Sequence, residues 1–251
     1  MKLKDKIVVV TGASSGMGKA ITRLFLNEGA IVAGVDIRED RLEGLKTEFE
    51  VGESLLTYVG DVSKRDQVDQ ILGDIIEKKG RLDILVNNAG IMDEMMPIGE
   101  VSDELWNRVI GVNLNGPMYL SRKAVNQMIV QGGGNIINIA SVGGLFGSRA
   151  GVAYTASKFA LVGMTKNIGY MYAGLGIRCN AIAPGGVNTD IGAGIKAPSP
   201  LGLDRAMSGF GMNPRTGEPE EIAKIALFLA SDDSSMINGA VITADTGWTA
   251  Y

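Results

Sequence analysis

Short apolar runs alternate along this chain with longer segments whose apolar residues recur at helical spacing. Ile7–Thr11 is a continuous β-branched run, typical of a strand buried on both faces of a parallel sheet. The same reasoning predicts strands at 31–35, Leu55–Val59, 82–86, 135–140, 177–183 and 240–244, and helices at 18–27, 38–50, 64–79, 103–131, 154–174 and 218–230. We therefore expect one Rossmann-like α/β domain covering residues 1–251. It should be a doubly wound parallel sheet of about seven strands, with helices on both faces.

Glycines and polar residues gather where these predicted strands end. The clusters are Gly12 to Gly18, Gly60-Asp61-Val62, Asn87-Asn88-Ala89-Gly90, Ser141 and Pro184-Gly185-Gly186. Ligands of such sheets bind beyond the carboxyl ends of the strands, which all meet at one edge. The sequence therefore predicts a single active site at this edge.

The first of these clusters is typical of dinucleotide binding. Gly12, Gly16 and Gly18 open a helix directly after a strand, and Asp36 ends the next strand. Glycines let the backbone approach a pyrophosphate at the helix N-terminus, and an acid at this distance binds the adenosine ribose. A nucleoside-triphosphate loop is excluded, because five residues separate Gly12 from Gly18-Lys19 and Ala20 replaces the magnesium-binding hydroxyl. A purely structural tight turn remains an alternative.

Composition narrows the class of protein. The chain has 24 lysines and arginines, 28 aspartates and glutamates and a net charge of -4, which argues against nucleic-acid binding. It has no histidine and a single cysteine, Cys179, so histidine-based hydrolysis, an internal disulfide and a metal centre are not expected. No apolar run suits a signal peptide or a membrane span. We expect a cytoplasmic enzyme.

Tyr154 and Lys158 stand four residues apart at the start of a predicted helix, so their side chains share one face. A tyrosine titrates near pKa ~10 in water, and a neighbouring cation lowers that pKa. The pair is therefore a candidate general acid/base at neutral pH. The same spacing is common on ordinary helices, so the assignment depends on the rest of the chain.

Taken together, the motifs resemble the short-chain dehydrogenase/reductase family over essentially the whole chain. They are Thr11-Gly12-x-x-x-Gly16-x-Gly18, Asn87-Asn88-Ala89-Gly90, Asn113, Ser141, Tyr154-x-x-x-Lys158 and Pro184-Gly185. The resemblance implies that Tyr154 is the acid/base and that Lys158 lowers its pKa and binds the nicotinamide ribose. It also implies that Ser141 binds the substrate oxygen and that Asn113 joins a proton relay through water.

The resemblance also implies which residues contact NAD and substrate. The expected cofactor residues are Gly12, Ser14, Ser15, Gly16, Met17, Gly18, Asp36, Ile37, Asp61, Val62, Asn88, Ala89, Gly90, Tyr154, Lys158, Pro184, Gly185, Val187 and Thr189. The expected substrate residues are Ser141, Tyr154, Met92, Met95, Gly185 and Met207.

Several of these residues also have a purely structural interpretation. Ser141 could satisfy backbone groups at its strand end, Asp61 could be a turn residue, and Met92 and Met95 could be ordinary loop packing. Pro117 removes the helical partner of the Asn113 carbonyl, which either frees it for a water or leaves a simple kink.

The segment 187–214 lacks regular periodicity and is rich in Gly, Ala, Pro and Ser. Long loops in compact domains are usually functional, so we expect a substrate lid. The C-terminal tail carries Trp248 and Tyr251, which we expect to be exposed. The resemblance implies that this tail and the two long helices pack between the subunits of a homotetramer.

We therefore expect an NAD(H)-dependent oxidoreductase that interconverts a secondary alcohol and a ketone. Asp36 favours NAD over NADP, and Arg38 is the one nearby residue that would soften this preference. A 3-oxoacyl-thioester (acyl-carrier-protein) reductase and a hydroxysteroid dehydrogenase are alternatives. An NAD-sensing scaffold without turnover is the alternative from another class of protein.

Overall fold

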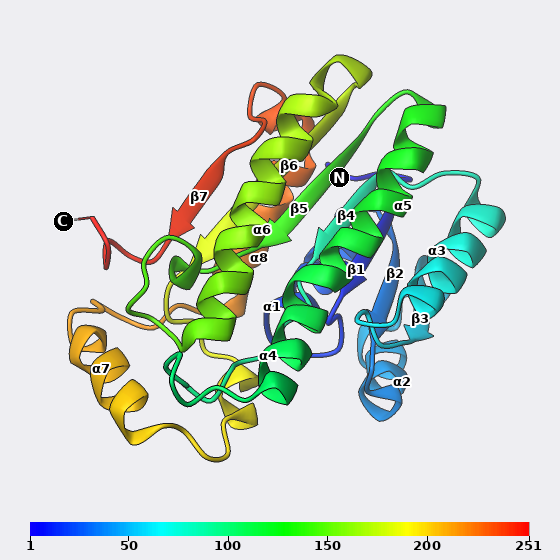
Figure 1. The fold of residues 1–251 in the computed structure, drawn as a ribbon. Helices are drawn as coiled ribbons and strands as arrows, with labels where there is room; N and C mark the ends of the chain where they lie inside the picture. The colour runs from blue at the N-terminus through cyan, green and yellow to red at the C-terminus, as the bar shows by residue number, and fades with distance from the viewer. Residues whose placement is uncertain (251) are drawn as a thin grey trace.

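The computed structural model describes residues 1–250 and contains a seven-stranded sheet that is parallel throughout (Figure 1). Its strands are β1 Ile7–Thr11, β2 Ile31–Asp36, β3 Leu55–Val59, β4 Ile84–Asn87, β5 Gly134–Ile139, β6 Ile177–Pro184 and β7 Val241–Ala244. They lie in the order β3-β2-β1-β4-β5-β6-β7. The strand order therefore reverses between β1 and β4, where doubly wound sheets bind their ligands. This confirms the predicted fold class.

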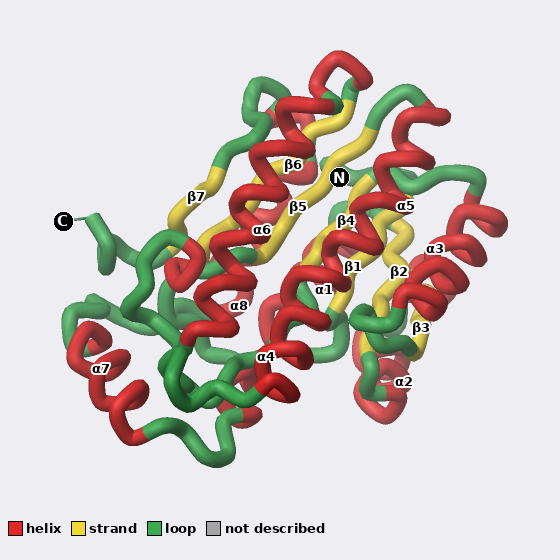
Figure 2. Tube along the Cα trace, in the orientation of Figure 1, coloured by secondary structure: helices red, strands yellow, loops and turns green. Residues whose placement is uncertain are grey.

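The helices cover both faces of this sheet. They are α1 Gly16–Asn27, α2 Glu39–Phe49, α3 Arg65–Lys79, α4 Asp103–Ile110, α5 Gly116–Gln131, α6 Val152–Met171, α7 Pro200–Phe210 and α8 Pro219–Ala230. Loops gather around α4 and α7, beyond the carboxyl ends of the strands (Figure 2). Within residues 1–250, no helix has the length and apolar character that crossing a membrane requires.

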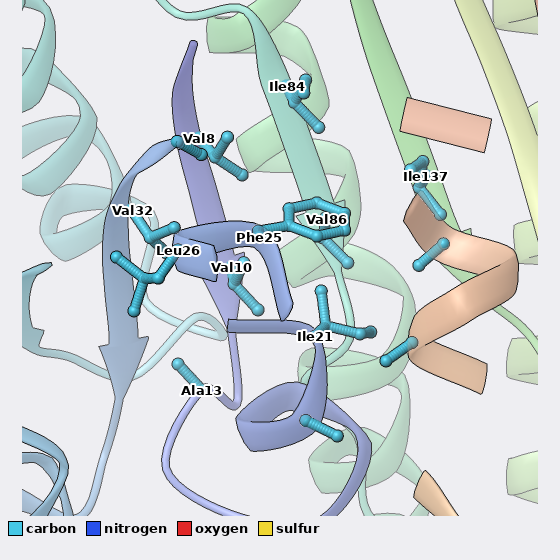
Figure 3. Close-up of a cluster of buried hydrophobic side chains, with 14 of the residues drawn as sticks. Val8, Val10, Ala13, Ile21, Phe25, Leu26, Val32, Ile84, Val86 and Ile137 are labelled. Carbon is cyan, nitrogen blue, oxygen red and sulfur yellow. The ribbon is translucent and has the colours of Figure 1, made fainter. Parts of the chain in front are cut away.

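Alternate residues of the strands build two separate apolar layers. Val8 and Val10 of β1 face the layer formed with α1, α2 and α8, where Phe25 is fully buried (Figure 3). Ile7 and Val9 face the other layer, formed with α3, α5 and α6. Burial on both faces explains why the strands are continuous apolar runs rather than alternating ones.

The predicted helix 103–131 is interrupted by a π-turn at Gly111–Asn115, which separates α4 from α5. The Gly116 N–H donates to the Gly111 carbonyl, five residues back rather than four. Pro117 has no N–H to continue the ladder, which accounts for the break at this point. Gly116 is also pressed against Val62, because a β-carbon there would lie 2.9 Å from the Val62 side chain.

The segment 187–214 is not the irregular loop that its composition suggests. It contains a short 3₁₀ turn, Asp190–Gly194, and the helix α7. Pro200 occupies the first turn of α7, and the Ser199 hydroxyl accepts the Gly202 N–H at 3.1 Å. These are standard N-terminal helix signals. Gly202 and Gly209 lower the helix propensity of the segment, which explains why the periodicity was weak.

The expectation of an exposed Trp248 is wrong, because this side chain is only 4 % exposed. Its indole N–H donates to the Gly209 carbonyl at 2.9 Å, and its ring packs edge-on against Phe210 of α7. The Arg149 guanidinium stacks on its face, 4.1 Å from the ring centroid. The tail therefore holds α7 in place within one chain. Tyr251 lies outside the described residues.

Candidate active site

Tyr154 and Lys158 lie on one face of α6, in its first two turns. Both are nearly buried, at 7 % and 3 % exposure. The Lys158 Nζ lies 5.6 Å from the centroid of the Tyr154 ring and donates to the Ile139 carbonyl at the end of β5, at 2.8 Å. The predicted pair therefore exists, and β5 orients its cation.

Burial dominates the electrostatics of the pair. Burial raises the pKa of Tyr154, a hydrogen bond with Ser141 opposes this rise, and the charge of Asp93 adds to it. Burial lowers the pKa of Lys158 to about 8. The Lys158 ammonium is directed at the Ile139 carbonyl, and burial is the largest influence on the pKa of Tyr154.

The lowered pKa of Lys158 predicts a pH-dependent stability. The ordinary lysine value is 10.5, so between about pH 8 and pH 10 the folded chain loses a proton that the unfolded chain keeps. The free energy of unfolding should therefore rise with pH in this window, by about 3 kcal/mol for this group. Urea unfolding of the parent and of Lys158→Met at several pH values tests it. Burial raises the pKa of Cys179 to about 12, so this thiol also makes stability depend on pH. Its contribution is the same in both proteins and cancels in the difference between their unfolding free energies. A difference that stays constant from pH 7 to pH 10 would contradict the assignment.

Ser141 lies two residues beyond the end of β5, at the start of a short 3₁₀ turn, and beside the tyrosine. Its hydroxyl accepts the Gly143 N–H at 3.0 Å and also forms the hydrogen bond with Tyr154. A β-carbon on Gly143 would lie 3.3 Å from the Ser141 Oγ and 3.4 Å from the Tyr154 ring. Ser141 therefore combines the strand-end role that was the structural alternative with the predicted position on the rim of Tyr154.

Asn113 lies in the π-turn and is fully buried. Its Oδ1 accepts the Ile91 N–H, and its Nδ2 donates to the Ile91 carbonyl and to the Ser157 hydroxyl. A β-carbon on Gly90 would lie 3.5 Å from both the Asn113 Oδ1 and the Lys158 Nζ. The structure therefore brings Asn113 and Lys158 together next to the Asn-Asn-Ala-Gly turn.

The glycine turn fits close contact with a pyrophosphate. Gly12 and Gly16 have φ values of 63° and 48°, and a β-carbon on Gly18 would lie 2.0 Å from the Gly12 carbonyl. Gly16 also lies against Thr189, whose methyl carbon would be 3.0 Å from such a β-carbon. A side chain fits at none of these places, so the N-terminus of α1 is open to a nucleotide.

A cleft of about 580 Å³ joins this turn to the Asn-Asn-Ala-Gly turn and to segment 187–214. Of the predicted cofactor and substrate residues, it is lined by Gly12, Ser15, Gly16, Met17, Asn88, Ala89, Gly90, Met92 and Thr189. Arg41 of α2 and Asp190 form an ion pair at 3.3 Å between two residues of its lining. This pair was not predicted, because nothing in the sequence relates residues so far apart.

The adenosine side of the predicted site follows β2 and β3. The Asp36 carboxylate accepts the backbone N–H and hydroxyl of Ser14, at 3.0 and 2.7 Å, and the Arg38 N–H at 3.1 Å. Ile37 and Asp61 line a neighbouring groove of about 710 Å³. Asp61 also accepts the N–H and hydroxyl of Ser63, as its turn interpretation expects.

The remaining predicted residues lie less directly on the cleft. Val62 is buried in the apolar layer of α3 and α5, and Val187 packs against the opposite layer. Gly185 follows Pro184, the last residue of β6, and lies against Asp245 and Trp248. Met95 contacts Gly202 through its carbonyl. Met207 of α7 is 53 % exposed and is not among the residues that line the cleft.

The acidic residue Asp93 was not predicted to be part of the site. It is fully buried and accepts the backbone N–H of Tyr154 at 2.8 Å and of Gly151 at 3.0 Å. Burial raises the pKa of Asp93, and these backbone hydrogen bonds oppose the rise. The only sequence feature that sets Asp93 apart is its place, with Glu94, between the apolar residues Met92 and Met95.

Comparisons with known proteins agree with this geometry. A family model described as enoyl-(acyl carrier protein) reductase matches residues 12–249. The chain is 49 % identical over 251 residues to 3beta-hydroxysteroid dehydrogenase 2 of Eggerthella lenta, covering 99 % of this chain and 96 % of that protein. It is 41 % identical to the 3-oxoacyl-acyl-carrier-protein reductase FabG of Thermotoga maritima, covering 98 % and 99 % of the two chains.

A solved structure supports the same conclusion. The crystal structure of levodione reductase superposes with a TM-score of 0.91 at 36 % identity, covering 99 % of this chain and all of the other. Because the matched region covers 99 % of this chain, the similarity extends over the whole sheet. This chain belongs to the short-chain dehydrogenase/reductase family of oxidoreductases.

Proposed function

We propose that this protein is an NAD(H)-dependent oxidoreductase that interconverts a secondary alcohol and a ketone. The observation that carries the proposal is the convergence of Asn113, Ser141, Tyr154 and Lys158 at the carboxyl edge of the sheet, beside a glycine turn with room for a pyrophosphate. A bound nicotinamide supplies or accepts the hydride. The protein holds the substrate oxygen and moves its proton.

In the oxidation direction, the Ser141 hydroxyl and the Tyr154 phenol bind the alcohol oxygen, and the phenolate takes its proton as the hydride leaves. The buried position of Tyr154 raises its pKa and favours the neutral phenol, which suits proton donation in the reverse, ketone-reducing direction. Lys158 lies one turn along α6, with its ammonium 5.6 Å from the ring centroid. Its pKa of about 8 leaves most of the ammonium charged at neutral pH.

The substrate class is tested by a panel of alcohols and ketones with NAD and NADH, followed by nicotinamide absorbance. A 3β-hydroxysteroid is the first candidate, because the relative of that name is 49 % identical over 99 % of this chain. A 3-oxoacyl thioester is the second, supported by the 41 % identical relative. Tight NAD binding with no absorbance change across chemically diverse members of the panel would favour the NAD-sensing alternative.

We also propose that segment 187–214 is a lid that closes over the substrate. It contains Thr189 beside Gly16 and carries α7, which the tail holds through Trp248. Trypsin cleavage after Lys196 and Arg205 should slow when NAD and a substrate analogue are both bound, because closure orders the segment. Cleavage after Lys46, in α2, serves as the internal control. Equal cleavage of the lid with and without both ligands would show an ordinary surface segment.

A homotetramer in the cytoplasm completes the proposal. Large apolar side chains are exposed along α6, with Phe159 at 44 %, Tyr170 at 83 % and Met171 at 61 %. Exposed apolar side chains of this size suit a subunit interface. Sedimentation velocity distinguishes a tetramer from a dimer or a monomer, and a monomer at working concentration would refute this part.

A further inference from the structure

The four residues 93–96 form a loop between the N-terminus of α6 and the segment before α7. On the side of α6, the buried Asp93 carboxylate accepts three backbone N–H groups: those of Tyr154 and Gly151, and that of Met95 at 3.3 Å. The Met96 carbonyl accepts the Val152 N–H at 2.9 Å. Within residues 1–250, no lysine or arginine forms an ion pair with Asp93. The carboxylate is therefore held by the helix that carries Tyr154.

The next residue makes the corresponding contacts on the side of the lid. The Glu94 Oε2 accepts the backbone N–H groups of Lys196 and Ala197, at 3.1 and 2.7 Å. The Glu94 carbonyl accepts the Ser199 N–H at 3.1 Å. A β-carbon on Gly202 would lie 1.7 Å from the Met95 carbonyl, so α7 starts directly on this loop.

The backbone between these two sets of contacts is strained. Glu94 and Met95 have φ values of 61° and 57°, in the left-handed region that residues with side chains rarely adopt. Consecutive strained residues persist only where the surrounding contacts determine their conformation, and such strain is concentrated at functional sites. If the lid contacts were released, the loop would relax, and Asp93 would move with it.

We propose that loop 93–96 couples the lid to the acid/base: Asp93 is a positioning residue for Tyr154, and Glu94 reports the position of the lid. The inference rests on the proposed catalytic role of Tyr154. Closure of the lid would set the loop, and the loop would set the first turn of α6. A displacement of a reacting group by about 1 Å costs roughly 100-fold in rate, so small movements of this loop are sufficient.

The effect of Asp93 on Tyr154 can be tested through the pH dependence of turnover, because charged and titratable groups surround Asp93. The phenol of Tyr154 on α6 feels the charge of Asp93. The carboxylate of Glu94 faces the lid backbone, and the ammonium of Lys158 faces the Ile139 carbonyl. Removing the charge of Asp93 should therefore move the pH limb assigned to Tyr154 to lower pH.

The experiment compares Asp93→Asn with Asp83→Asn, a second buried aspartate that accepts a backbone N–H, from Ile7, but pairs with Arg81 near the start of β4. For the best alcohol of the panel, Asp93→Asn should lower kcat on the order of 10- to 100-fold and lower the pH of the Tyr154 limb. Asp83→Asn should lower stability but leave kcat and the pH of the Tyr154 limb unchanged. Asp93→Asn should also speed trypsin cleavage at Lys196 with NAD bound, although the hydrogen bonds of Asp93 within residues 1–250 go to Met95, Met96, Gly151 and Tyr154 and not to the lid.

Glu94→Ala tests the coupling from the side of the lid, because Glu94 bonds to the lid backbone and not to α6. It should speed lid cleavage and lower kcat, whereas Glu94→Gln, which keeps an acceptor oxygen for both N–H groups, should restore the parent values. The coupling would be overturned if Asp93→Asn unfolded cooperatively but was cleaved by trypsin at the parental rate. It would also be overturned if the effects of Asp93→Asn and Glu94→Ala on kcat simply multiplied in the variant that carries both substitutions. The cleavage measurements do not depend on turnover. Failure of the proposed function would therefore appear separately, as unchanged turnover in Tyr154→Phe.

Discussion

Tyr154→Phe is expected to lose nearly all turnover, by roughly 100- to 10,000-fold, the usual contribution of a general acid/base. The substitution removes only the phenolic oxygen, and the ring that packs with Val109 and Ala153 remains. The Tyr154 N–H would still donate to Asp93, so α6 should keep its position. NAD affinity should change little, because the glycine turn and Asp36 lie on other elements. Stopped-flow turnover and NADH fluorescence titration measure the two effects.

Tyr170→Phe is the matched control for this experiment. Tyr170 lies on the same helix, far along it from Tyr154, and is 83 % exposed on the face proposed for the subunit interface, so losing its hydroxyl should leave turnover unchanged. If Tyr154→Phe retained turnover within about tenfold of the parent while the control behaved normally, Tyr154 would not be the acid/base. Lys158→Met should reduce both turnover and NAD affinity, because its ammonium lies near the Tyr154 ring and near Gly90, which lines the cleft.

The fold was predictable because each of its strands and turns has a local sequence pattern. A strand buried on both faces must be continuously apolar, as in β1, and a glycine that cannot accept a β-carbon, such as Gly18, marks the turn that follows. Tyr154 and Lys158 were also predictable, because helical spacing alone places them on one face. The order of the elements along the chain then fixed which edge of the sheet holds the site.

The errors arose where distant segments meet. Trp248 was expected to be exposed because its partners, Gly209 and Arg149, are far away in the sequence. The helix α7 depends on packing that compensates for its glycines, and propensity cannot show such packing. The direction of the pKa shift in Tyr154 depends on burial and on the contact of Lys158 with β5, which spacing does not reveal.

The position of Asp93 illustrates the same limit within the site. Its role depends on two N–H groups at the start of α6, and hydrogen bonds to backbone carry no sequence signature. An acidic residue in a methionine-rich loop resembles a solvent-exposed charge until the fold buries it. Residues that act through the backbone of another residue are therefore the part of an active site that a single sequence hides most effectively.

Cofactor choice is expected to favour NAD over NADP by roughly 2–4 kcal/mol, on the order of 30- to 1000-fold in kcat/KM. Ser14 and the Arg38 N–H hold the Asp36 carboxylate in place, so the charge that would face a 2′-phosphate is fixed. Arg38, the cation expected to soften this preference, donates two hydrogen bonds to Asp40 at 3.0 and 2.9 Å. The charge of Asp36, rather than that of Arg38, should therefore determine the cofactor preference.

Asp36→Ser should erase much of this preference, chiefly by raising kcat/KM for NADP, because the repulsion of the 2′-phosphate is lost while the hydroxyl still binds a ribose. Asp40→Ser is the informative companion, since it keeps Asp36 and releases Arg38. It should relax the preference only partly, and the double variant should use NADP best. Measuring kcat/KM with both cofactors in all four proteins separates the two charges. A parent enzyme that already uses NADP as well as NAD would show that Arg38 leaves Asp40 for the phosphate, and the assignment of Asp36 would be wrong.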